Sequence, residues 1–247
     1  MPADSRHCPA VPDEKSSHAA PRDAAAGAPG RAAAAAAPLE VALRGVTKTY
    51  GAVRALVGVS LSFRAGRITM VEGPNGSGKS TLLSIVGTLS RPTSGSVSHG
   101  ALGASRADIR AQLGWVGHDA LAYADLSGRE NVELAARLYG IDPKGAWSAA
   151  LDRFDLAGFG ERPLRTYSRG QRQRIALARA LVHHPRLVLL DEPTAGLDAK
   201  STARLQEVVR EESARGAVVV VITHDPVFAE IGDVRHRLER GRLVQAQ

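Results

Sequence analysis

A glycine-rich segment between residues 73 and 80 holds the first side chains that could do chemistry. Its sequence, GPNGSGKS, matches the pattern G-x-x-x-x-G-K-[ST], with an apolar stretch before it and a helical pattern after it. In such a loop, backbone N–H groups surround phosphate oxygens and the following helix adds its dipole. Lys79 is expected to reach the β- and γ-phosphates, and the Ser80 hydroxyl to ligate Mg²⁺. The predicted phosphate-binding residues are Gly73, Pro74, Asn75, Gly76, Ser77, Gly78, Lys79, Ser80 and Thr81.

Two adjacent acids, Asp191 and Glu192, end the apolar run RLVLLDE. A strand of this composition is typically buried on both faces, so both acids are expected at its carboxyl end. Asp191 suits holding Mg²⁺ through water, and Glu192 suits polarising an attacking water. A solvated turn is the alternative for the acid pair. The phosphate loop alone leaves kinases, GTPases and motor ATPases open.

Alternating strand and helix patterns must position these residues. The runs RITMVEG, RLVLLDE and GAVVVVITHD indicate buried strands, and helical patterns follow or separate them, which predicts a mostly parallel α/β sheet. The middle of the chain, about residues 119–180, is nearly all helical and is expected to form an inserted lobe. Within it, Ser127 and Glu130 form a capping-box pattern at the start of a helix that ends near Gly140.

The composition separates the first 38 residues from the rest. Residues 1–38 are rich in alanine and proline with few large apolar side chains, which predicts a disordered tail before a folded domain over 39–247. The chain is 44% hydrophobic, carries a formal net charge of +7 and has one cysteine, Cys8. An anionic partner is therefore expected, no intramolecular disulfide can form, and no apolar stretch approaches the roughly 20 residues of a membrane-spanning helix.

The segment YSRGQ, Tyr167–Gln171, adds the decisive motif. With the phosphate loop and the acid pair, it makes residues 39–245 resemble the ATP-binding-cassette (ABC) ATPases, whose signature is normally Leu-Ser-Gly-Gly-Gln. Ser168, Gly170 and Gln171 match, whereas Tyr167 and Arg169 depart from it. The resemblance implies a P-loop NTPase core, an N-terminal antiparallel β subdomain and a helical subdomain. It also implies ATP and Mg²⁺ as ligands and a homodimer or ABC heterodimer on ATP binding, in which Ser168 faces the partner's ATP.

Other positions match the family one by one. Tyr50 in KTYG matches the aromatic residue that stacks on adenine, although plain packing is the alternative. The loop AGLD, which ends at Asp198, resembles the loop that crosses the dimer interface. His224 in VITHD matches the histidine that senses the γ-phosphate. Arg169 is expected to add charge near the triphosphate, whereas Arg172, Arg174 and Arg179 are expected on a solvated helix face with salt bridges. His183 and His184 are interpreted as a plain turn.

Residue 118 departs from the family, which usually has a glutamine there that contacts Mg²⁺ and the attacking water. His118 could also ligate Mg²⁺ or accept a hydrogen bond from water, or it could only shape its loop. With a histidine at this place, GWVGHDALAYADLSGREN resembles the ATPase subunit of haem exporters of cytochrome c maturation. A generic exporter of drugs, lipids or polysaccharides remains an alternative.

The resemblance implies a peripheral subunit at the cytoplasmic face of the cell membrane, bound to integral membrane transporter subunits. A soluble ABC protein that acts on nucleic acid or ribosomes is a rival that the basic charge favours. One cassette without a coiled-coil insertion argues against it, so no nucleic acid is expected. A P-loop kinase is the second rival, but it has no use for SRGQ or His224.

Overall fold

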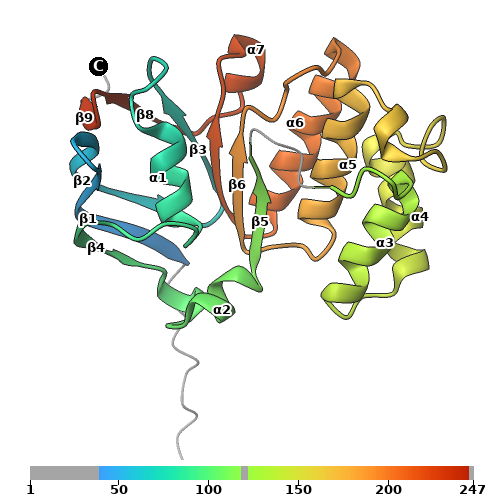
Figure 1. Cartoon of the computed structure of the whole chain (residues 1–247), viewed down its shortest axis with the longest axis horizontal. Coiled ribbons are helices and arrows are strands. Elements are labelled where there is room, and N and C mark those ends of the chain that lie inside the picture. Colours follow the sequence, from blue (N-terminus) through green and yellow to red (C-terminus); the bar gives the residue numbers. More distant parts are fainter. Residues whose placement is uncertain (1–38, 118–121, 245–247) are drawn as a thin grey trace, which may run out of the picture. The chain divides into compact units, whose positions relative to one another are not determined.

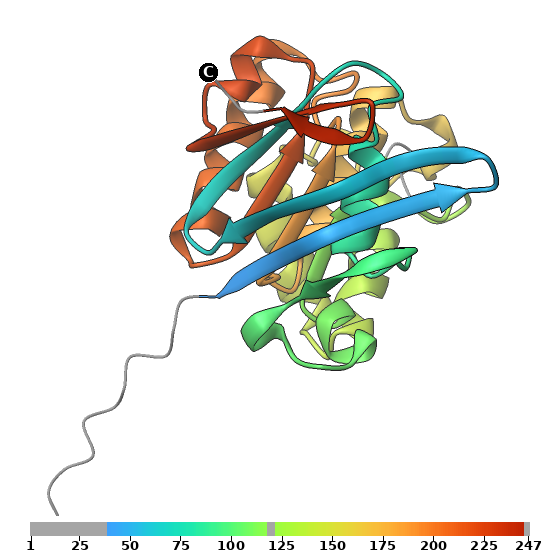
Figure 2. The same ribbon diagram turned by 90° about the vertical axis from the view of Figure 1, so that its left-hand side faces the viewer.

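The structure is a computed structural model that describes residues 39–117 and 122–244. Three strands from the first part of this region form an antiparallel sheet in the order β2-β1-β4. Figure 2 shows them side by side. The strands are β1 (Glu40–Tyr50), β2 (Val53–Arg64) and β4 (Ser94–Ser98). The predicted N-terminal antiparallel subdomain is confirmed. Its long hairpin turns at Gly51, whose φ of 56° lies in the left-handed region that glycine adopts without strain.

A second, six-stranded sheet follows the order β5-β6-β7-β3-β8-β9 (Figure 1). Its strands are β3 (Arg67–Glu72), β5 (Leu113–Val116), β6 (Leu187–Asp191), β7 (Val218–Ile222), β8 (Val234–Glu239) and β9 (Arg242–Val244). All pairings are parallel except β8 with β9. β6 and β7 are buried at every position, as their unbroken apolar sequences predict. The carboxyl ends of β3, β6 and β7 therefore meet at one edge of the sheet.

Helices cover both faces of this sheet. They are α1 (Lys79–Val86), α2 (Arg106–Arg110), α3 (Gly128–Leu138), α4 (Pro143–Phe154), α5 (Arg169–Leu181), α6 (Ala199–Ala214) and α7 (Pro226–Ala229). Alternate residues of β7 belong to two different cores. Val218 and Val220 pack with α1 and the antiparallel sheet, whereas Val219 and Val221 pack with α5, α6 and the helical lobe. In the described part of the chain, no helix is both long and apolar enough to cross a bilayer.

The predicted helical lobe contains α3, α4 and the first turns of α5 (Figure 1). The capping box forms as expected, because Glu130 N–H donates to Ser127 Oγ (3.1 Å) and Ser127 N–H donates to Glu130 Oε2 (2.7 Å). Tyr167 is almost fully buried, donates to Phe159 O (2.7 Å) and accepts from Gly128 N–H (3.1 Å). The tyrosine in place of the family's leucine therefore joins the start of α3 to the segment before α5.

Of the three α5 arginines expected on a solvated face, Arg172 is exposed, whereas Arg174 and Arg179 are not. The Arg174 side chain is only 19% exposed and pairs with Asp155, so the expected salt bridge forms but the solvation does not. Arg179 has a buried Nε with no hydrogen-bond partner among the described residues, and burial lowers its pKa. The expected turn after α5 forms, with His184 N–H donating to Leu181 O (3.2 Å), but His183 is packed rather than free in solvent. His183 stacks on Tyr139 with centroids 3.7 Å apart, and burial lowers its pKa to about 4.

Candidate functional site

The glycine-rich loop connects β3 to α1 and depends on two of its glycines. Gly73 has φ 142°, and a Cβ there would lie 2.0 Å from Leu238 O. Gly78 has φ 103°, and a Cβ there would lie 2.3 Å from Ala55 O. Neither backbone conformation nor space admits a side chain, so these glycines let the loop pack directly against β8 and β2. Gly76 differs, because a Cβ there would meet no atom within 4 Å.

Lys79 begins α1 and points back into the loop. Its Nζ donates to Gly73 O (2.7 Å) and Pro74 O (3.0 Å), and the residue is 7% exposed. Burial lowers the pKa of the ammonium group, while the nearby Glu192 and Asp191 carboxylates oppose that change. A cation is thus held next to a loop rich in backbone N–H groups, which is a site suited to phosphate.

The two acids and the histidine come from the ends of neighbouring strands. Asp191 is the last residue of β6 and is 8% exposed. Glu192 follows at φ 51°, and its N–H donates to Ile222 O (2.9 Å). The Glu192 carboxylate accepts from the backbone N–H of His224 (3.2 Å), and its Oε1 lies 3.5 Å from His224 Nε2. The parallel pairing of β6 with β7 therefore holds Glu192 and His224 side by side.

These groups line one open cavity of about 510 Å³. Its predicted residues are Asn75, Gly76, Ser77, Gly78, Lys79, Ser80, Thr81, Asp191, Glu192 and His224. Sequence reasoning missed four further lining residues, Val53, Arg54, Ala55 and Ile222. The first three lie on β2, which reaches the loop through the contact between Ala55 and Gly78. The sequence held only a weak signal for Arg54, namely that it follows the predicted adenine-stacking residue Tyr50 by four positions. The packing of β2 on the loop is what places Arg54 at the cavity.

Other predicted residues lie outside this cavity. Gly73 and Pro74 line an adjacent cavity of about 520 Å³, which His224 also lines. Tyr50, at the end of β1, is 51% exposed, and Lys48 Nζ lies 4.7 Å from its ring centroid. Its ring is therefore open to a ligand, although it does not line the Lys79 cavity. His118 lies outside the described residues.

The signature residues are at the start of α5, away from Lys79. Ser168 and Gln171 form a capping box, in which Gln171 N–H donates to Ser168 Oγ (3.2 Å) and Ser168 N–H donates to Gln171 Oε1 (3.0 Å). A Cβ on Gly170 would lie 2.2 Å from Gly196 O, so α5 packs directly on the AGLD loop. Asp198 caps α6 by accepting from Ser201 N–H (2.8 Å). None of these residues lines the cavity around Lys79.

Comparison with known proteins identifies the family. The ABC transporter family matches residues 56–195, a range that runs from β2 through the phosphate loop and signature to the acid pair. The chain belongs to the ABC transporter family. A dimeric post-hydrolysis structure of the ATP-binding cassette MJ0796, bound to ADP and Pi, is similar with a TM-score of 0.76 and 31% identity, covering 84% of this chain and 97% of that one.

Curated relatives of this ABC chain have different described roles. It is 39% identical over 195 residues to the cytochrome c biogenesis ATP-binding export protein CcmA 2 of Cupriavidus metallidurans, covering 78% of this chain and 92% of that protein. It is 31% identical over 215 residues to the lipoprotein-releasing system ATP-binding protein LolD of Bacteroides fragilis, covering 83% and 100%.

A third relative is the daunorubicin resistance ATP-binding protein DrrA3 of Streptomyces coeruleorubidus. The two are 37% identical over 189 residues, which cover 74% of this chain and 60% of that protein. Relatives with three different described roles thus match to a similar degree. The P-loop fold is confirmed, and the chain is an ABC-type ATPase whose nucleotide is ATP.

The cavity of this ABC ATPase also suits a hard divalent cation. Ser80 and Asp191 both line it and offer only oxygen donors. Within residues 39–117 and 122–244 there is no cluster of three or more His, Cys, Asp or Glu side chains that could hold a metal alone. Mg²⁺ fits such a site, because it takes one or two protein oxygens and completes its coordination with substrate phosphates and water.

Proposed function

We propose that this ABC ATPase powers export through membrane-spanning subunits that are separate chains. The observation that carries the proposal is one cavity in which Lys79, Ser80, Asp191, Glu192 and His224 gather from three strand ends. This cavity can bind a polyphosphate and its cation and can position an attacking water next to them. The export role rests on the relatives, whose names describe cytochrome c biogenesis export, lipoprotein release and drug resistance.

Each residue has a proposed role in ATP hydrolysis. Lys79 and the loop N–H groups bind the β- and γ-phosphates, with Ser80 and Asp191 on the Mg²⁺ side. Bound Mg²⁺ neutralises charge that builds up on the phosphate oxygens. Glu192 polarises the attacking water, and the backbone N–H and imidazole of His224 orient the Glu192 carboxylate.

We further propose that ATP is sandwiched between two copies of the ATPase. Ser168, Gly170, Gln171 and Asp198 gather on the starts of α5 and α6, outside the chain's own Lys79 cavity. If these residues complete the nucleotide site of the other copy, they must lie apart from the Lys79 cavity of their own chain. The exposed N-terminal turn of α5 offers N–H groups to a γ-phosphate on the other copy. The similar MJ0796 cassette is itself described as dimeric.

We propose that Tyr50 stacks on adenine at the other end of the nucleotide, whereas Arg54 adds a second cation near the phosphates. Arg54 lines the cavity and makes no ion pair or side-chain hydrogen bond within the described ranges. Replacing Arg54 with glutamine should weaken ATP binding about threefold to tenfold, because a charged hydrogen bond to phosphate is lost. Calorimetric titration with ATP, ADP and AMP checks this, with a loss that grows with the number of phosphates.

Arg44→Gln is the matched control for Arg54. Arg44 is an exposed arginine on the neighbouring strand β1, and it lines none of the cavities described above. This variant should bind ATP as the wild type does, so it separates a local contact from a general change in charge. Equal ATP affinity of Arg54→Gln and wild type would rule out the contact.

The transporter role predicts stable association with membrane subunits. A tagged chain purified from detergent-solubilised membranes of its own host should bring down integral membrane proteins in fixed stoichiometry. Hydrolysis of ATP by that complex should respond to its transported substrate after reconstitution, because transport and hydrolysis are coupled. Recovery of only the tagged chain, or of ribosomes or nucleic acid instead, would contradict the export role and favour the soluble alternative.

Haem is the cargo we propose to test first. The motivation is the histidine at position 118 and the similarity to the cytochrome c biogenesis protein CcmA 2. A generic exporter fits the cavity equally well, because cargo contacts are expected in the membrane subunits. In the same host, deleting the gene should abolish haem-stained c-type cytochromes and leave b-type cytochromes unchanged. Normal c-type cytochromes would exclude this cargo and leave the ATPase assignment intact.

A further inference from the structure

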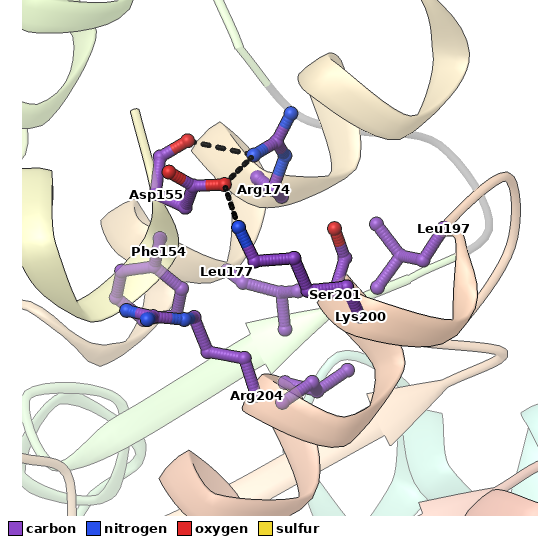
Figure 3. Close-up of a pocket in the computed structure, with 9 residues that line it drawn as sticks. Phe154, Asp155, Arg174, Leu177, Leu197, Lys200, Ser201 and Arg204 are labelled. Atoms are coloured by element: carbon purple, nitrogen blue, oxygen red, sulfur yellow. Dashed lines mark hydrogen bonds and ion pairs between the residues drawn. The ribbon is translucent and has the colours of Figure 1, made fainter. Parts of the chain in front are cut away.

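The end of α4 meets the middle of α5 and the first turns of α6 at a small, closely packed seam. Phe154, Leu177 and Leu205 supply its apolar part. Its polar part is centred on Asp155, as Figure 3 shows. The seam affects the positions of Ser168 and Asp198, because α5 starts directly after Ser168 and α6 starts directly after Asp198. Both residues belong to the surface proposed above to meet the second copy.

Asp155 contacts both of these helices. Its Oδ2 lies 3.3 Å from Arg174 Nη1 on α5 and 3.8 Å from Lys200 Nζ on α6. Its backbone carbonyl also accepts from Arg174 Nη1 (2.6 Å). A second link from the same end of α4 runs from Arg204 on α6 to the backbone carbonyl of Asp152. One helix end thus contacts two successive helices, which β6 separates in the sequence.

The neighbours of Asp155 keep this arrangement in place. Arg174 is 19% exposed and its guanidinium carbon lies 4.6 Å from the Phe159 ring centroid, so it has little freedom to turn away. Asp155 itself adopts φ 52°, the left-handed conformation in which α4 ends. Aspartate and asparagine both tolerate this conformation, so asparagine can replace Asp155 without a new backbone cost.

The same two cations also act on the interface loop. Arg174 and Lys200 are among the charges that lower the pKa of Asp198, after its hydrogen bonds with Ser201. Behind them, the loop is packed against α5, because Gly170 adjoins Gly196 O and Gln173 Nε2 donates to Pro193 O (3.0 Å). Arg174 and Lys200 therefore interact electrostatically with both Asp155 and Asp198.

We propose that Asp155 is a positioning residue that joins the middle of α5 to the start of α6 and thereby holds the two helix starts as one rigid surface for the second copy. The inference rests on the proposed ATP-bound dimer. Asp155 lies away from the nucleotide cavity, so it does not contact the reacting atoms. Its effect is pre-organisation, because a surface whose two halves are already aligned loses less conformational freedom when the copies associate.

The test measures dimerisation and nucleotide binding separately, in a Glu192→Gln parent, which is expected to bind ATP with greatly lowered turnover. Asp155→Asn should raise the ATP concentration for half-maximal dimerisation about fivefold, because a partly exposed ion-pair network is lost from each copy. The ATP affinity of the dilute monomer should stay within about twofold of the parent. Light scattering during size-exclusion chromatography gives the first quantity and calorimetry the second.

Two controls separate positioning from general stability. Asp152→Asn removes an exposed acid from the same helix end but keeps the backbone carbonyl that Arg204 contacts, so it should dimerise as the parent does. The Asp155→Asn effect should also shrink in about 1 M salt, because the Asp155 and Lys200 side chains are exposed and their charges are screened. A loss that persists at high salt together with a lower melting temperature would indicate a merely structural residue and overturn the inference.

The remaining outcomes are also decisive. Identical dimerisation of Asp155→Asn and the parent overturns the positioning role and leaves the proposed function intact. A parent that stays monomeric with ATP and Mg²⁺ overturns the proposed dimer, and the inference falls with it. Non-additive effects of Asp155→Asn and Lys200→Met support the inference, because they show that the two charges act through each other.

Discussion

Glu192→Gln should lower ATP turnover about 10²-fold to 10⁴-fold while ATP binding is retained. The carboxylate lies in the cavity beside Lys79 and is held by the backbone N–H of His224. A glutamine keeps the shape and can still occupy this position, but it cannot take a proton from the attacking water. Phosphate release under saturating ATP measures turnover. The retained ATP should then hold two copies together, which size-exclusion chromatography with ATP and Mg²⁺ detects.

Glu230→Gln is the control for this substitution. Glu230 is exposed just after α7, lies outside the cavity and makes no side-chain ion pair within the described residues, so turnover should stay unchanged. Turnover of Glu192→Gln close to that of the wild type would mean that another group activates the water. A variant that remains monomeric in every nucleotide condition would contradict the sandwich dimer.

Gly78→Ala should weaken ATP binding by at least about 10²-fold. The added methyl would lie 2.3 Å from Ala55 O and would also meet the Leu56 side chain, so the loop must move away from β2. A displacement on the order of 1 Å misaligns several N–H groups and Lys79 relative to the phosphates, and errors of this size are costly. Calorimetric titration with ATP measures the loss, and circular dichroism verifies that the variant folds.

Gly76→Ala offers a control in the same loop. Gly76 also has a positive φ, 76°, but its Cβ would meet no atom within 4 Å. Its cost is therefore limited to backbone strain of roughly 1–2 kcal/mol, and ATP binding should weaken far less. Equal losses of ATP affinity in Gly78→Ala and Gly76→Ala would show that backbone strain alone causes the loss. The contact of the loop with β2 would then be unimportant for ATP binding.

Much of this protein was predictable from the sequence because the relevant signals are local. The unbroken apolar runs of β6 and β7 indicate strands buried on both faces, and the parallel sheet follows from their alternation with helices. The phosphate loop and the acid pair are recognisable because the glycines and lysine of the one, and the carboxylates of the other, are close together in the sequence. Glu192 and His224 were both expected at strand ends, and parallel pairing brings them to one edge.

Tertiary structure decided which other residues join them. Arg54 reaches the cavity only because β2 packs on the loop at Gly78. Asp155 contacts both Arg174 and Lys200 only because α4 ends beside the middle of α5 and the start of α6. The expected solvation of the α5 arginines was wrong for Arg174 and Arg179, since the burial of a long polar side chain depends on its neighbours. Helical periodicity predicts which residues share a face, whereas only the packed fold determines what covers that face.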